Sequence, residues 1–154
     1  MATGVPSVST NDAIAARNFA IEIDGTQIAQ FTEISGMTSE LEVTDLKENG
    51  PDGKLIIKKW PGARKPPTLT LKRAKNVSMD LHKWHQLALD GKVKEARKHG
   101  SIVLYDFEGA EIARWNFTNA WPSKLSVGGL KAGSNDVVTE EATLVMEHFE
   151  RVPK

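Results

Sequence analysis

Residues 54–75 read KLIIKKWPGARKPPTLTLKRAK and hold eight of the chain's twenty Lys and Arg residues, with no Asp or Glu among them. Before this stretch, SELEVTDLK (residues 39–47) alternates Leu41 and Val43 with polar residues, and NGPDG (residues 49–53) is dense in turn-forming residues. Alternation with period two on both sides of a turn is typical of a β-hairpin. The sequence therefore predicts one long hairpin, with carboxylates on its first arm and ammonium groups on its second.

Opposite charges are segregated along the chain, although the formal net charge is zero. Residues 1–53 carry nine acidic and two basic side chains, and the purely basic stretch follows at once. In an antiparallel hairpin, Glu40 and Glu42 are expected to pair across the strands with Lys58 or Lys59, each pair contributing about 0.2 to 1 kcal/mol.

Proline and glycine residues predict how the second arm ends. Trp60-Pro61-Gly62 (residues 60–62) is expected to form a type II turn, because Pro presets φ and Gly tolerates positive φ. Two further prolines favour extended backbone before TLTLKR, residues 68–73. This stretch is expected to be a strand with Leu69 and Leu71 facing inward.

The remaining segments predict further antiparallel strands and one helix. Hairpins are expected about the turns at residues 24–25 and 108–109. Ser78 is expected to cap a helix over about residues 78–90, with Leu81 and Trp84 on its apolar face. Residues 123–135 are expected to form a mobile loop, and residues 136–150 one long strand.

About seven strands and one helix make the expected fold α+β and mainly antiparallel β. Two packed sheets, or a β-barrel-like domain, would carry one flanking helix and the long protruding hairpin. At 154 residues the chain is the size of one domain. We expect residues 1–16 to be a flexible N-terminal arm and residues 17–150 to form the β-barrel core.

Composition limits the chemistry and the location of the protein. The absence of Cys leaves no disulfide framework or Cys-ligated metal site. The N-terminus lacks the pattern of a secretory signal, and no stretch approaches the roughly 18 apolar residues of a membrane span. We expect synthesis in the cytoplasm and no stable association with membranes.

Candidate catalytic and ligand-binding motifs are weak. His82 and His85 lie three residues apart on the expected helix, but a metal site needs a third ligand. GPDGK, residues 50–54, has neither the spacing of a phosphate-binding loop nor the Ser or Thr that follows its Lys. No nucleophile elbow or thiol nucleophile is present. We therefore expect no enzyme activity, no cofactor and no metal.

Two functions remain for the basic stretch. A cationic track with Trp60 is the kind of surface that binds single-stranded nucleic acid, so a monomeric nucleic-acid-binding β-domain using residues 54–75 is one alternative. Neutral net charge argues against it. Oppositely charged patches on one chain favour head-to-tail contacts between copies, which close into rings or propagate as filaments.

Three stretches in this order resemble the tail tube proteins of contractile phages and of phage-like contractile injection systems, and more distantly the tube protein of type VI secretion. They are EIDGTQIAQFTEISGM (Glu22 to Met37), the PG…K…TLKR run (Pro61 to Arg73) and W-x-F-x-N-A-W-P-x-K (Trp115 to Lys124). The likeness extends from Phe19 to about Phe149. No single motif is diagnostic, so the resemblance depends on the ordered set.

The resemblance implies a structural subunit of an inner tube. Six copies would close a ring, and rings would stack head-to-tail into a hollow conduit for effector protein or DNA inside a sheath. Baseplate or hub proteins and a terminator would be further partners, and no specific nucleic acid is implied. The hairpin, about Leu41 to Trp60, would reach the neighbouring ring.

Combined with the charge pattern, this predicts that acidic residues of one copy meet basic residues of another. The predicted contact residues are Glu40, Glu42, Glu48, Asp52, Lys54, Lys58, Lys59, Trp60, Arg64 and Lys65.

Overall fold

A computed structural model describes residues 18–28, 31–75 and 78–153; the expected arm over residues 1–16 lies outside this part. The elements follow one another along the chain as β1 (Phe19–Ile23), β2 (Thr26–Ile28), β3 (Phe31–Ser35), β4 (Glu40–Asn49), β5 (Leu55–Lys65), β6 (Leu69–Ala74), α1 (Asp80–Leu89), α2 (Val93–Ala96), β7 (Lys98–Tyr105), β8 (Glu111–Val127), β9 (Thr139–Val145) and β10 (His148–Arg151). All the strand pairs are antiparallel. The predicted α+β class with mainly antiparallel strands is confirmed.

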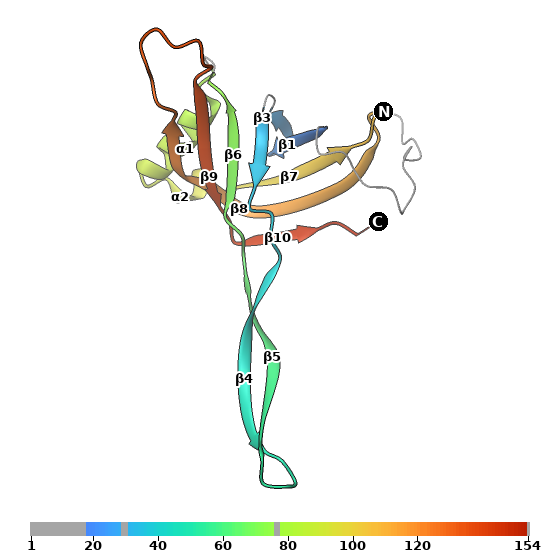
Figure 1. Cartoon of the computed structure of the whole chain (residues 1–154). Helices are drawn as coiled ribbons and strands as arrows, with labels where there is room; N and C mark the ends of the chain where they lie inside the picture. The colour runs from blue at the N-terminus through green and yellow to red at the C-terminus, as the bar shows by residue number, and fades with distance from the viewer. Residues whose placement is uncertain (1–17, 29–30, 76–77, 154) are drawn as a thin grey trace.

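One bent sheet forms the body, with strand order β2-β1-β7-β8-β9-β6-β3 and β10 on the far side of β8. The long strand β8 belongs to two layers (Figure 1): its first half pairs with β7 and β10, and its second half, from Trp121, pairs with β9. β2 and β3 end the strand order and do not pair with each other. The body is therefore a two-layered open sheet among the described residues, as the predicted two packed sheets require, and these residues form no closed barrel. The predicted extent of the core, residues 17–150, stays a prediction.

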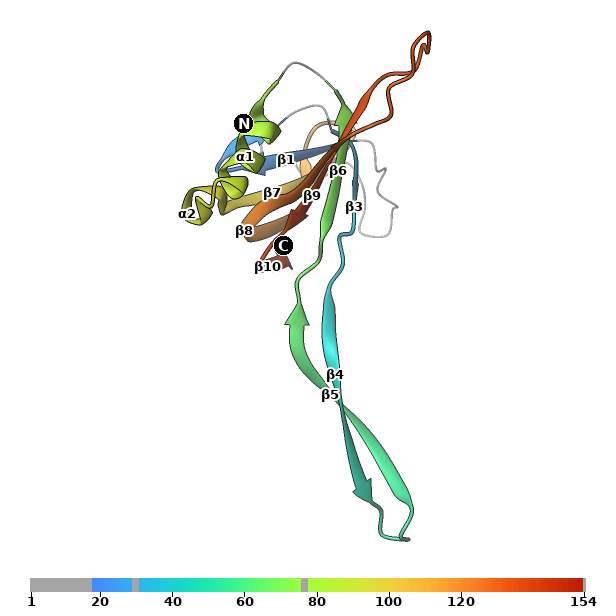
Figure 2. The same ribbon diagram turned by 90° about the vertical axis from the view of Figure 1, so that its left-hand side faces the viewer.

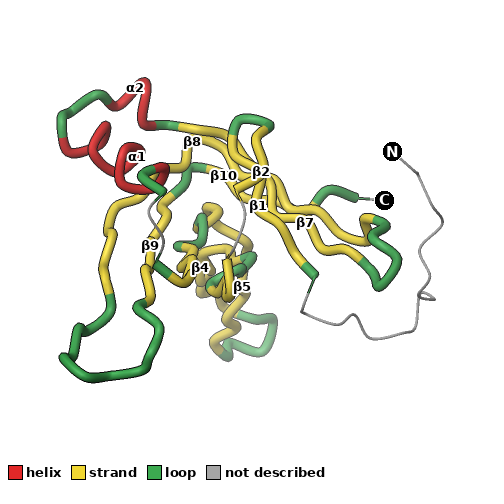
Figure 3. The backbone as a smooth tube through the Cα atoms, turned by 90° about the horizontal axis from the view of Figure 1, so that it is seen from above, coloured by secondary structure: helices red, strands yellow, loops and turns green. Residues whose placement is uncertain are grey.

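The hydrophobic core lies between these layers. Ile21, Ile102 and Phe117 come from one layer, and Leu69 and Leu144 from the other, all almost wholly buried. Helix α1 closes one side of the same cluster with Leu81 and Trp84. Figure 3 shows α1 and α2 together at one edge of the body.

The residue that precedes helix α1 lies one position later in the sequence than expected. Met79, not Ser78, precedes the first helical residue and makes no capping hydrogen bond, although the Ser78 hydroxyl accepts a long hydrogen bond from the Asp80 N–H at 3.5 Å. Asp80 takes over part of that role, because its carboxylate accepts a hydrogen bond from the Leu81 N–H at 2.8 Å. At the C-terminus Gly91 adopts a φ of 76°, which ends the helix without steric cost.

The long hairpin is a separate two-stranded sheet, β4 with β5, that leaves the body at one pole (Figures 1 and 2). Strand β5 continues through Pro61 and Gly62, so the predicted type II turn is wrong. Both strands of a two-stranded ribbon are edges, where Pro is tolerated. The register shifts between Leu41 and Val43, and there a Cβ on Gly62 would lie 3.0 Å from the Glu42 carbonyl oxygen, which explains the glycine.

Two other expectations about the C-terminal third are corrected. Strand β8 continues to Val127, so the loop begins later than residue 123. The expected strand over residues 136–150 is broken into β9 and β10. The break has a topological cause, because the chain turns after Met146 to leave β6 and join the first half of β8, where the Glu147 N–H donates to the Thr118 carbonyl.

Candidate assembly surface

The β4–β5 hairpin exposes apolar side chains that no part of the described chain covers. Every residue of β4 is exposed, and so is nearly all of β5. Val43 is 63% exposed, Leu55 61% and Trp60 56%. Large apolar side chains gathered in the open on one element indicate an interaction site, and an isolated two-stranded hairpin is at best marginally stable in water. The hairpin therefore has the composition of an element that is completed by another molecule.

Both faces of the hairpin carry such side chains. Residues directly opposite in an antiparallel pair share a face, and Lys47 lies opposite Ile57 whereas Glu48 lies opposite Ile56. One face accordingly presents Val43, Leu55 and Ile57, and the other presents Leu46, Ile56 and Trp60. Contact with a partner on one side only would leave half of this apolar surface in water.

Ion pairs cross the hairpin in a register different from the one expected. Lys58 lies 3.0 Å from Glu48 and Lys59 lies 2.9 Å from Asp45, whereas Glu40 lies 3.5 Å from Lys65. The predicted pairing of Glu40 and Glu42 with Lys58 or Lys59 is therefore wrong. The length of the hairpin keeps these residues apart. Because its arms have ten and eleven residues, Glu40 lies at the root of the hairpin and Lys58 lies toward its tip.

All ten predicted contact residues lie on β4, β5 or the turn between them. Near the tip, Lys54 is 4.0 Å from Asp52. Among the described residues, only two of the charged members, Glu42 and Arg64, form no ion pair. The predicted contacts with another copy stay a prediction, because the pairs seen here are within one chain.

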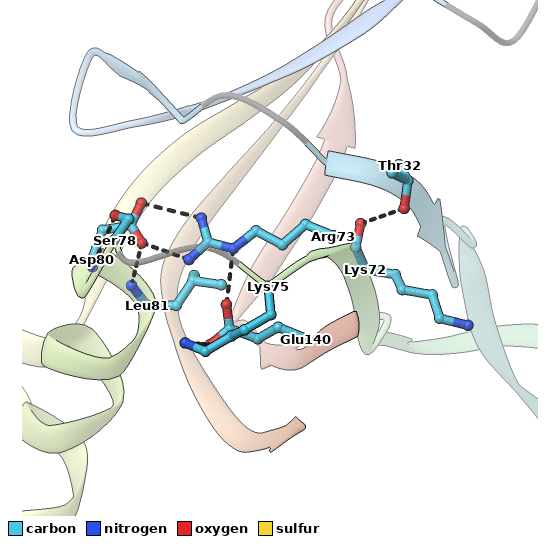
Figure 4. A network of polar contacts seen from close by, with 8 residues as sticks. All are labelled: Thr32, Lys72, Arg73, Lys75, Ser78, Asp80, Leu81 and Glu140. Carbon is cyan, nitrogen blue, oxygen red and sulfur yellow. Dashed lines mark hydrogen bonds and ion pairs between the residues drawn. The ribbon is translucent and has the colours of Figure 1, made fainter. Parts of the chain in front are cut away.

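Near the other end of the basic stretch, Arg73 is buried. Arg73 donates from Nε to Glu140 at 2.9 Å and from Nη2 to Asp80 at 2.8 Å, and Lys75 lies 3.4 Å from Glu140 (Figure 4). The Arg73 guanidinium also lies 5.6 Å from the centre of the Phe31 ring. This network joins β6, β9 and the first turn of α1.

Burial and charge oppose each other in this network. Burial favours the neutral forms, but hydrogen bonds and charges of the partners outweigh it, so the pKa of Arg73 is raised and the pKa of Asp80 is lowered. Sequence reasoning missed the network, although a signal was present. Arg73 continues the inward alternation of Leu69 and Leu71, and Glu140 lies directly opposite it on β9.

No catalytic or metal site emerges from residues 18–28, 31–75 and 78–153. No group of three or more potential metal ligands occurs there. His82 is exposed, and His85 Nδ1 lies 2.9 Å from the Pro122 carbonyl oxygen. No helix in this part of the chain is long and apolar enough to cross a membrane.

A two-layered antiparallel body that carries an exposed hairpin with apolar side chains is typical of a subunit that binds other molecules through that hairpin. The sequence model of the T4-like virus tail tube protein gp19 family matches residues 15–150. The chain belongs to this family of structural tail tube proteins.

Solved structures share the fold. A chain of an extracellular contractile injection system (PVC) sheath–tube complex in the extended state is 22% identical, with a TM-score of 0.73, 95% of this chain and 99% of that chain being covered. A chain of the anti-feeding prophage tube-terminating cap is 21% identical, with a TM-score of 0.74 and full coverage of both chains. Hcp1 from Flavobacterium johnsoniae is 15% identical, with a TM-score of 0.52 and coverage of 87% and 94%. Among curated proteins, no sequence matches the chain significantly.

Proposed function

We propose that this chain is a single tail-tube domain that closes into six-membered rings, which stack head-to-tail as the inner tube of a contractile injection system or phage tail. One observation carries the proposal: a hairpin with apolar side chains exposed on both faces, in a member of the tail tube family. A heterologous contact joins two different patches, so it propagates from copy to copy. The tube serves as a conduit, and the chain has no enzyme activity.

The similar structures suggest the partners. They include a sheath–tube complex, a sheath/tube terminator and a baseplate, so a sheath around the tube and proteins that begin and end it are proposed partners. Effector protein or DNA is the proposed cargo of the lumen. The subunit is made in the cytoplasm and functions within the assembled particle.

Electron microscopy of the purified chain, beside size-exclusion chromatography, tests the proposal. Rings or tubes with an axial channel are expected, since the contact surface belongs to the chain itself. A monomer that retains short oligonucleotides at physiological salt would overturn the proposal in favour of a nucleic-acid-binding β-domain.

The contacts within the basic stretch weigh against that alternative. Arg73 is buried between two carboxylates, and five of the six lysines of the stretch lie within 4.0 Å of a carboxylate of the same chain. Phosphate groups would have to compete with these pairs, and in the described part of the stretch only Arg64 and Lys72 form no ion pair. Steeply salt-dependent oligonucleotide binding is therefore not expected.

A further inference from the structure

A groove lies at the root of the hairpin, where β4 and β5 leave the body beside β10. Its volume is about 230 Å³. Apolar contact is offered by Leu41, Pro66, Pro67 and Phe149, and charged side chains surround it. We call this the root groove.

Arg64 is the charged side chain of the root groove that has no partner within the described chain. The other charged side chains that line it have partners: Glu40 pairs with Lys65, Glu147 with Arg97, and Glu150 with His148 at 3.2 Å when the imidazole is protonated. Arg151 lies over the Trp115 ring at 5.5 Å. Within the described chain, Arg64 has no such partner and is exposed. The groove therefore fits a ligand that brings one carboxylate and a small apolar group.

The hairpin tip, residues 49–54, has this chemistry. Asp52 projects from the turn with its side chain 62% exposed, beside the exposed Pro51. Its carboxylate accepts a hydrogen bond from the Lys54 N–H at 3.2 Å, which orients it at the end of the hairpin. The Lys54 ammonium, 4.0 Å away and 84% exposed, neutralises it only weakly.

Length decides whether the tip of one copy can meet the groove of another. Arms of ten and eleven residues span about 33 Å at roughly 3.3 Å per residue. A body of about 100 residues has a radius of gyration of about 13 Å, which corresponds to a diameter of about 35 Å. Copies stacked head-to-tail with their bodies in contact repeat at about this distance. A hairpin that runs along the neighbouring body therefore ends at the level of that neighbour's own hairpin root.

We infer that the root groove of each copy receives the hairpin tip of a copy in the adjacent ring, with the Asp52 carboxylate bound to the Arg64 guanidinium. The inference rests on the proposed function, because it requires head-to-tail stacking. It adds the specific contact and fixes how far the hairpin reaches. The long hairpin thereby acts as a spacer whose length matches the height of one ring.

Disulfide trapping in assembled tubes tests the contact, and the absence of Cys from the chain makes the test clean. Lys54→Cys at the tip is combined with Glu150→Cys in the groove, and the tubes are oxidised. Within one chain these sites are separated by about the length of the hairpin, whereas a disulfide needs Cα atoms about 4.4–6.8 Å apart. Each bond must therefore join two copies, and a ladder of dimers, trimers and longer chains is expected on a non-reducing gel.

Lys54→Cys with Lys83→Cys is the matched control, because Lys83 lies exposed on α1, away from the groove. Tubes in which only this control pair cross-links, or in which neither pair does, would overturn the inference and leave the proposed function standing. A chain that forms no rings or tubes by electron microscopy would overturn both.

Removing the two charges tests the pairing itself. Asp52→Asn keeps the oxygen that accepts from Lys54 N–H, and Arg64→Gln keeps a polar side chain. Each is expected to raise the critical concentration for assembly about tenfold, and the double variant no further, because the two residues act on one contact. A hundredfold rise in the double variant would show that they act independently and would overturn the pairing.

Discussion

Arg73 and Glu140 face each other across β6 and β9, joined by a 2.9 Å hydrogen bond although each side chain is only 2% exposed. A buried ion pair is satisfied only while both members are present, because a single charge left in the core pays its full desolvation cost. This ion pair thus lies inside the body, whereas the ion pairs of the hairpin are exposed.

Arg73→Met should lower the free energy of unfolding by about 3 to 5 kcal/mol, because the buried Glu140 would keep only the partly exposed Lys75 at 3.4 Å and Asp80 would lose its partner. Urea unfolding followed by circular dichroism measures this change. The double variant Arg73→Met/Glu140→Leu is the control and should regain most of the loss. A single variant that costs less than about 1 kcal/mol would contradict the role assigned to the pair.

Acid should remove part of the stability that Asp80 provides. Its pKa is lowered in the folded chain: burial acts to raise it, but hydrogen bonds from the Arg73 guanidinium and the Leu81 N–H outweigh burial. A group with a lowered folded pKa stabilises above its unfolded pKa of about 3.9 and loses that contribution as pH falls through the folded value. The stability difference between the wild type and Asp80→Asn should therefore hold at neutral pH and shrink below about pH 4.

Unfolding midpoints measured from pH 7 down to pH 2 for both chains test this dependence. Asp136→Asn in the β8–β9 loop is the matched control, because no ion pair ties its carboxylate to the described chain. A difference between Asp80→Asn and the wild type that stays constant down to pH 2 would be inconsistent with the lowered pKa.

Ile57→Ser should prevent assembly without destabilising the monomer. Ile57 is 53% exposed on a hairpin that contributes nothing to the core, so the free energy of unfolding should change by no more than about 0.5 kcal/mol. Sedimentation and urea unfolding separate the two effects. Ile57→Val keeps an apolar surface and should still assemble, whereas tubes at normal yield from Ile57→Ser would count against the hairpin as a contact surface.

Reversing Lys58 and Lys59 to Glu should impair polymerisation while the monomer stays folded, because basic side chains would no longer meet acidic ones of another copy. The same change also breaks the pairs with Glu48 and Asp45 inside the hairpin. Glu48→Lys with Lys58→Glu separates these effects, since it restores the internal pair with its polarity exchanged. If the exchanged pair assembles as well as the wild type, the charges act only within the hairpin.

The sequence predicted correctly which residues face inward in strands whose side chains alternate. It did not predict contacts that depend on the register between paired strands. Leu69 and Leu71 were placed inward correctly because a strand buried on one face shows period two. The partners of Lys58 and Lys59 were wrong because register follows from the exact length of each arm and from a shift opposite Gly62. The open form of the sheet depends on how far β8 bends, and no short sequence pattern predicts that bend.

The hairpin leaves the body at one pole only, and this makes any stack of copies directional. One terminus of such a polymer would present bare hairpins with apolar side chains on both faces, and the other would present bodies with unfilled grooves. Growth at the two termini would proceed with different rate constants. A protein that initiates the polymer and a protein that stops it would therefore need surfaces of opposite kind, one a receptor for hairpins and the other a mimic of them.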